Sequence, residues 1–122
     1  MYGFIIVSHS KDVAKGTKDI IEQMVGDMDN LKVIACGGTE DGDIGTSVTM
    51  VQEAIETLYD TEHIFIFTDI GSSIMSSEMA IDLLEDEELQ AKITIMEKPI
   101  VEGAFEAAVG VSTGQSVEEI VE

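Results

Sequence analysis

Hydrophobic residues gather in four short runs along the chain: Phe4–Val7, Leu31–Cys36, Ile64–Phe67 and Ile93–Met96. The runs are rich in β-branched and aromatic residues, and polar positions rarely interrupt them. Nearly continuous apolar strands are typical of a parallel sheet that helices cover on both faces. The pattern therefore predicts four buried strands.

Between these runs, apolar residues recur every three or four positions, which is the spacing of one face of a helix. Such stripes run from Val13 to Met24, from Val48 to Leu58, from Met75 to Leu84 and from Ile100 to Val109. We expect the methionines of these stripes to fill the core, because a flexible thioether packs well into irregular gaps.

Local signals mark where several of these helices begin. Thr46 or Ser47 is a candidate cap for the second helix, and Pro99 suits the first turn of the fourth. The sequence "SVEE", residues 116–119, has capping-box spacing and predicts a short last helix. Alternating strands and helices predict an α/β fold with a doubly wound, mainly parallel β-sheet flanked by helices. We expect one domain over residues 1–122.

Charge and cysteine content narrow the function classes. A formal net charge of −19 disfavours binding to nucleic acid or to an anionic membrane surface, and it favours a protein partner with a basic face. No apolar stretch approaches the ~18 residues of a membrane span, and the N-terminus carries no signal-peptide pattern. The lone Cys36 predicts a buried thiol in a reducing cytoplasm.

Polar and glycine-rich segments follow each predicted strand. Ser8-His9-Ser10 follows the first, "GGTEDGDIGTS" (residues 37–47) the second, "TDIGSS" (residues 68–73) the third and Glu97-Lys98 the fourth. Ligands of open α/β sheets bind beyond the carboxyl ends of the strands. We therefore expect these segments to converge. His63 precedes the third strand and is expected at the opposite edge.

His9 is the candidate nucleophile at this edge. A neutral imidazole offers a nucleophilic nitrogen, and Asp69 could accept a proton from the other ring nitrogen and so fix the tautomer. Asp69 could alternatively cap the following helix. Glycine amides and hydroxyl groups that could hold an anion surround the pair, and we expect the phosphate-binding residues to be Ser8, Ser10, Gly37, Gly38, Thr39, Gly71, Ser72 and Ser73.

Other known motifs are absent or incomplete. The glycine loop lacks the lysine of a Walker motif, and its spacing does not form a dinucleotide fingerprint. Glu40, Asp41 and Asp43 lack the remaining ligands of a calcium loop, so no metal site is predicted. The serines do not form the nucleophile elbow of an esterase.

Four segments carry a family resemblance that spans nearly the whole chain: "IIVSHSKDVAKG", "GGTEDGDIGTS", "TDIGSSIMSSEMAIDLL" and "KPIVEGAFEAAVGVSTG". They resemble the phosphotransfer subunit of the bacterial dihydroxyacetone kinase that draws on the phosphoenolpyruvate phosphotransferase system. The fold relative of that subunit is the enzyme IIA domain of mannose-type sugar transporters.

The resemblance implies that His9 receives a phosphoryl group from the phosphocarrier protein HPr and passes it to ADP on the nucleotide-binding kinase subunit. Asp69 matches the aspartate beside the active histidine. The resemblance also implies a cytoplasmic homodimer in glycerol metabolism, with no cofactor bound directly. Two alternatives remain open: a small-anion or nucleotide sensor that uses the same glycine loops, and a hydrolase with His9 as general base.

Overall fold

The computed structural model describes residues 1–26 and 29–122 of the chain. Strands and helices alternate along most of it. In chain order the elements are β1 (Tyr2–Ser8), α1 (Lys11–Met24), β2 (Leu31–Gly37), α2 (Val48–Thr57), β3 (His63–Thr68), α3 (Gly71–Asp82), α4 (Glu87–Ala91), β4 (Ile93–Met96), α5 (Ile100–Ser112) and α6 (Val117–Val121). The four predicted strands are confirmed, with β1, β2 and β3 longer than predicted by three, one and two residues.

The strands form a parallel sheet in the order β2-β1-β3-β4. In the centre of the sheet, Phe4 of β1 lies opposite Val33 of β2 and Phe65 of β3. The chain moves from β1 to β2 on one side and then crosses to β3 on the other side. The strand order therefore reverses at β1, and in open α/β sheets such a reversal, here at the carboxyl ends of β1 and β3, is the usual place for a ligand.

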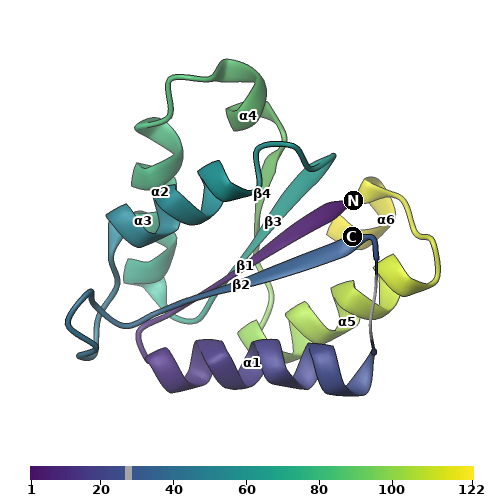
Figure 1. Ribbon diagram of the computed structural model, residues 1–122, viewed down its shortest axis with the longest axis horizontal. Coiled ribbons are helices and arrows are strands. Elements are labelled where there is room, and N and C mark those ends of the chain that lie inside the picture. Colours follow the sequence, from purple (N-terminus) through teal and green to yellow (C-terminus); the bar gives the residue numbers. More distant parts are fainter. Residues whose placement is uncertain (27–28) are drawn as a thin grey trace.

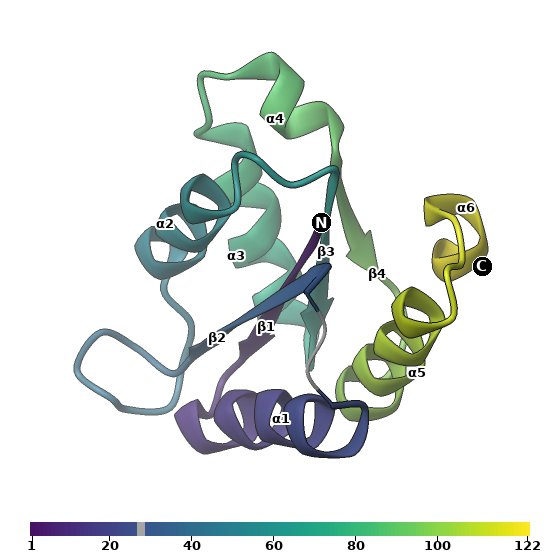
Figure 2. The ribbon, with the colours of Figure 1, turned by 45° about the vertical axis from the view of Figure 1, so that its right-hand side comes forward.

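Two layers of helices bury the two faces of the sheet, and the predicted fold class is confirmed. Phe4 and Ile6 point to the side of α1, α5 and α6, whereas Ile5 and Val7 point to the side of α2, α3 and α4. Figures 1 and 2 show these two layers on opposite sides of the strands. All four side chains are at most 1% exposed, which explains why β1 reads as a continuous apolar run.

The helix starts follow the local signals, with small departures. Ser47, rather than Thr46, caps α2, and Ser116 with Glu119 forms the predicted capping box of α6. Pro99 lies one residue before α5. The sequence pattern did not predict α4, because its five residues are too few to show a helical stripe.

The expectation that the methionines fill the core is wrong for α3 and for the end of α1. Met75, Met79 and Met24 are 69%, 55% and 70% exposed. Small residues, among them Ser73, Ser77 and Ala80, form the buried side of α3, so its methionines point to solvent. The described helices include none that is long and apolar enough to cross a membrane.

Candidate active site

The site lies where β1 and β3 end side by side. His9 follows the last residue of β1, and Asp69 follows the last residue of β3. Since these strands are hydrogen-bonded neighbours in parallel register, residues separated by 60 positions in the chain come together. The predicted pair therefore lies at the reversal of strand order, where β1 and β3 end.

Asp69 holds both the backbone and the ring of His9. Its Oδ2 atom accepts hydrogen bonds from the His9 backbone N–H at 2.9 Å and from the Ser8 hydroxyl at 2.8 Å. Its Oδ1 atom lies 2.9 Å from His9 Nδ1 and accepts from the Ile70 backbone N–H at 2.8 Å. The sequence pattern gave no signal for Ile70. The helix-cap hypothesis is wrong, because Ile70 is the N-cap residue of α3 and no side chain caps it.

These hydrogen bonds keep Asp69 ionised. Burial by itself would raise the pKa of the carboxyl group, but the bonds from His9, Ser8 and Ile70 outweigh it and lower the pKa well below its usual range. A carboxylate can only accept hydrogen bonds, so His9 Nδ1 carries the hydrogen. The lone pair of the neutral imidazole is then on Nε2.

The Nε2 atom of His9 faces α3. The Ser72 hydroxyl, in the first turn of α3, hydrogen-bonds to this atom. The side chains of His9 and Asp69 are 17% and 21% exposed, so the ring is held firmly but one edge reaches solvent. A ring with Nδ1 held by a carboxylate and Nε2 contacted by a hydroxyl group is arranged for nucleophilic attack or for proton transfer through Nε2.

Ser8 and Ser73, two of the residues expected to bind phosphate, are instead buried and form hydrogen bonds that hold Asp69. Ser8 and Ser73 are 0% exposed. Ser8 donates its hydroxyl hydrogen to Asp69, and the Ser73 hydroxyl accepts from the Asp69 backbone N–H at 3.2 Å and donates to the Ile70 carbonyl at 2.6 Å. The expectation that these two hydroxyl groups face an anion is therefore corrected.

Backbone N–H groups of the glycine-rich loop of residues 37–47 also form hydrogen bonds within the protein. The Gly38 N–H donates to the Ser8 carbonyl at 3.1 Å, and the Thr39 N–H donates to the Asp43 carbonyl at 2.9 Å. The loop also fixes the backbone of His9, because the Gly45 N–H donates to the His9 carbonyl at 2.9 Å. The loop thus shapes the backbone at the site, and these two amides are not directed at a ligand.

Ser10, Gly71 and Ser72 lie at the two helix ends that flank His9. Ser10 caps α1 and accepts from the Val13 N–H at 3.3 Å. Gly71 and Ser72 are exposed in the first turn of α3. Helix N-termini carry partial positive charge and unpaired N–H groups, so an anion beside Nε2 would be stabilised by α3 without any cationic side chain.

Gly37 lets the start of α1 pack against the end of β2. A Cβ atom on Gly37 would lie 2.5 Å from the Ser10 carbonyl oxygen and 2.6 Å from Lys11 Cα. Because both obstacles are backbone, Gly37→Ala should lower the free energy of unfolding by about 1–3 kcal/mol. Gly16→Ala, within α1 and with nothing within 4 Å, should raise it slightly. Equal melting temperatures for the two variants would contradict this packing.

The low pKa of Asp69 predicts a pH-dependent contribution to stability. A depressed folded-state pKa stabilises the fold fully above the ordinary aspartate pKa of about 3.9, and this stabilisation disappears as the pH falls toward the folded-state pKa. Urea unfolding should therefore show a larger gap between the wild type and Asp69→Asn at about pH 7 than at about pH 3. A gap independent of pH would contradict the ionised carboxylate.

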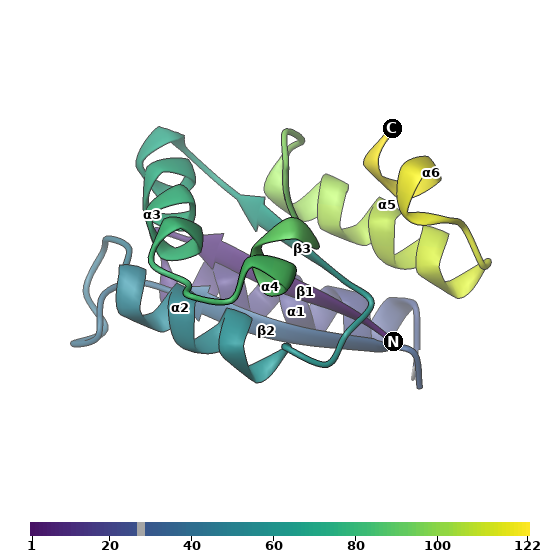
Figure 3. The ribbon, with the colours of Figure 1, turned by 90° about the horizontal axis from the view of Figure 1, so that it is seen from above.

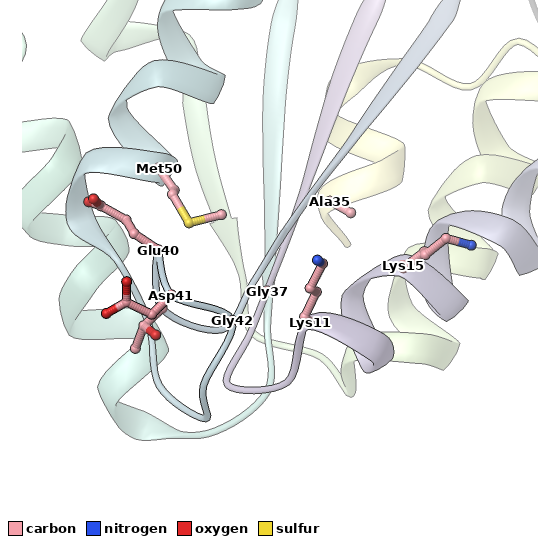
Figure 4. Close-up of a pocket in the computed structure, with 9 residues that line it drawn as sticks. Lys11, Lys15, Ala35, Gly37, Glu40, Asp41, Gly42 and Met50 are labelled. Atoms are coloured by element: carbon pink, nitrogen blue, oxygen red, sulfur yellow. The ribbon is translucent and has the colours of Figure 1, made fainter.

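A cavity of about 350 Å³ lies at the end of β2, where Ala35 and Gly37 line it. Lys11 and Lys15 line it from α1, and Glu40 and Asp41 line it from the loop (Figure 4). Lys15 points away from these two carboxylates in Figure 4. His9 does not line the cavity, so its volume is separate from the reactive ring.

His63 lies at the opposite end of the sheet, as predicted. It begins β3, and its Nε2 atom lies 2.8 Å from the Thr94 hydroxyl. Burial lowers the pKa of His63, and this effect is opposed by nearby Glu118 and reinforced by Lys92. Within residues 1–26 and 29–122, no three His, Cys, Asp or Glu side chains are arranged to hold a metal ion.

The fold agrees with what comparison with known proteins shows. The family model EIIA-man, described as the PTS system fructose IIA component, matches residues 3–121. The chain belongs to this family, within the branch of dihydroxyacetone kinase phosphoryl donor subunits. The resemblance stated from the sequence is thereby confirmed.

Three relatives illustrate this branch. The phosphoryl donor subunit DhaM of PEP-dependent dihydroxyacetone kinase 2 from Listeria innocua is 45% identical, and the alignment covers 100% of this chain and 95% of that protein. The phosphotransferase subunit DhaM from Lactococcus lactis is 35% identical, with 99% and 91% covered. The DhaM subunit from Providencia stuartii is 41% identical, but the alignment covers 99% of this chain and only 25% of that longer protein.

Solved structures share the fold. The crystal structure of a protein of unknown function has 34% sequence identity and a TM-score of 0.89, with 98% of this chain and 89% of that chain covered. The phosphotransferase system component EIIA from Streptococcus agalactiae has 21% identity and a TM-score of 0.66, with 99% and 87% covered. The second likeness supports the fold alone.

Proposed function

We propose that this chain is a phosphoryl carrier. His9 accepts a phosphoryl group from the phosphocarrier protein HPr and passes it to ADP on the nucleotide-binding subunit of dihydroxyacetone kinase. The observation that carries this proposal is the His9 ring, which is held at Nδ1 by Asp69 at 2.9 Å and presented at Nε2 beside Ser72. The relatives named DhaM supply the kinase context.

The reaction on His9 begins with attack by Nε2. Its lone pair forms a bond to the phosphorus of phosphorylated HPr, the N–P bond of the carrier breaks, and that electron pair returns to the carrier nitrogen. Positive charge then develops on the His9 ring. The ionised Asp69 carboxylate, bonded to Nδ1–H, stabilises this charge without taking the proton.

In the second transfer, the phosphorylated His9 is the donor and ADP is the acceptor. A terminal phosphate oxygen of ADP attacks the phosphorus, the bond to Nε2 breaks, its electron pair returns to the ring, and ATP forms. Within the described residues, no lysine pairs with His9 or Asp69. Uncharged donors such as the Ser72 hydroxyl hold the phosphoryl group less tightly than a lysine would, which favours its departure.

The same proposal includes the chain's localisation, its assembly and its protein partners. The chain acts as a phosphotransferase subunit in the cytoplasm and forms a homodimer. It binds no cofactor of its own, because ADP is held by the kinase subunit. These expectations follow from the family, and the net charge of −19 supports basic protein partners rather than nucleic acid.

Reconstitution tests the proposal. Phosphoenolpyruvate, enzyme I and HPr should add one phosphate to the chain, and this phosphate should be labile to acid and stable to base. Addition of the nucleotide-binding subunit loaded with ADP should then remove it and form ATP. If the isolated chain instead binds ADP tightly by calorimetry and takes no phosphate from HPr, the nucleotide-sensor alternative replaces the carrier.

A further inference from the structure

Helix α3 carries a stripe of exposed apolar side chains that leads away from the site. Met75, Met79 and Leu83 are 69%, 55% and 54% exposed. They follow Ser72 at spacings of three and four residues, so Ser72 and these three side chains lie along one side of the helix and its end. We call Met75, Met79 and Leu83 the α3 stripe. Exposed apolar patches of this kind mark interaction sites.

The stripe begins at the reactive ring. Ser72 contacts His9 Nε2, and Ile70, which follows Asp69, is 61% exposed. Ile44 is 76% exposed in the neighbouring loop. That loop is tied to α3 by a 2.7 Å hydrogen bond between the Thr46 and Ser76 hydroxyl groups. A protein that covers the stripe would therefore also reach His9.

The charge around the stripe determines which partner fits it. Glu78 and Asp82 lie on α3 beside the stripe, and both are exposed. Residues 40–91, which include α2, α3 and α4, contain fourteen of the 25 acidic residues and no lysine or arginine. Figures 1 and 3 show these helices grouped on one side of the sheet. This helical layer is therefore anionic and carries no Lys or Arg with which to pair another acidic surface.

A second copy of the chain fits this surface poorly. Two such faces would bring carboxylates against carboxylates, and like charges in an interface are costly. A partner with apolar side chains at its centre and lysine or arginine at its rim would bury the methionines and pair with Glu78 and Asp82. Long, flexible methionine side chains adapt well to such a partner.

We propose that the α3 stripe is the surface on which the phosphoryl donor protein docks. This inference rests on the proposed function. A phosphoryl group approaching His9 is anionic, and no Lys or Arg of residues 40–91 attracts it from the α3 side; the lysine nearest to His9 in the sequence is Lys11, at the start of α1. A donor protein with a basic face would supply positive charge on the α3 side of His9, and an acidic surface around the stripe attracts such a protein.

The test measures phosphoryl transfer from phosphorylated HPr to a variant whose stripe carries two introduced positive charges. Met75→Lys/Met79→Lys should raise KM for HPr at least about tenfold and leave the rate at saturating HPr unchanged, because truncating or charging contact residues costs mainly docking. Met24→Lys/Val109→Lys is the matched control: it makes the same number of substitutions at exposed positions of α1 and α5. Its KM should stay within about twofold of the wild type.

A second measurement separates docking from damage to the site. Phosphoramidate is a small phosphoryl donor that needs no docking surface, and it should phosphorylate His9 of the stripe variant at the wild-type rate. A slower reaction with phosphoramidate would mean that the substitutions disturb His9, which would overturn the assignment to docking.

Three further outcomes would overturn the inference. In the first, the stripe variant keeps the wild-type KM for HPr. In the second, it slows only the transfer to the kinase subunit. In the third, the wild type is a dimer and the stripe variant is a monomer, which would assign the stripe to contact with a second copy. Failure of the proposed function looks different, because the wild type itself would then take no phosphate from HPr.

Discussion

His9→Ala should take up no phosphate from phosphorylated HPr, whereas His63→Gln should take it up at the wild-type rate. His9 presents Nε2 to Ser72 at the carboxyl ends of β1 and β3, and Asp69 fixes Nδ1 at 2.9 Å. Among the residues that the structure describes, His9 is the only histidine at these strand ends, so phosphorylation should fall to the background rate, about 10⁴-fold or more below the wild type.

The two histidine variants control for each other. His63 lies at the amino end of β3, and glutamine at this position can keep a hydrogen bond to Thr94. Intact mass measured under alkaline conditions would show the added phosphate. Phosphate on His9→Ala, or its loss from His63→Gln while the variant stays folded, would contradict the assignment of His9.

Asp69→Asn should slow phosphoryl transfer to His9 by about 10²–10³-fold with little change in KM for HPr. An asparagine amide can donate to Nδ1, which favours the tautomer with hydrogen on Nε2 and removes the attacking lone pair. The substitution also removes the negative charge that stabilises the ring as phosphorus bonds to it.

Nitrogen NMR of the unphosphorylated chain distinguishes this role from a merely structural one. The wild-type ring should carry its hydrogen on Nδ1, and the Asp69→Asn ring should carry it on Nε2. Asp69 also accepts from the backbone N–H groups of His9 and Ile70, so the melting temperature of the variant must be measured alongside. An Asp69→Asn variant that reacts at the wild-type rate would contradict the orienting role.

Much of the fold could be predicted from the sequence because the strands are buried on both faces. The run Phe4–Val7 is nearly inaccessible to solvent on both sides of the sheet, so its composition alone marks a strand. Burial on both faces also hides the strand order. A strand whose apolar and polar residues do not alternate gives no indication of which strands lie next to it. The reversal at β1, which brings Asp69 to His9, is a tertiary property.

The candidate site could be predicted as a location but not in its details. The rule that ligands bind at the carboxyl ends of parallel strands placed His9 and Asp69 at one edge. It could not show that Ser8 and Ser73 are buried and support Asp69, because the sequence carries no signal for the direction in which a serine hydroxyl points. Nor could helical spacing show that the small residues of α3, and not its methionines, face the core.

Phosphorus NMR of the chain after phosphorylation by HPr tests the central claim most directly, when combined with nitrogen labelling of the histidine rings. The account predicts a single phosphohistidine at His9, with phosphorus bonded to Nε2 and hydrogen retained on Nδ1 beside Asp69. Phosphorus on Nδ1 of His9, on His63 or on any serine would contradict it.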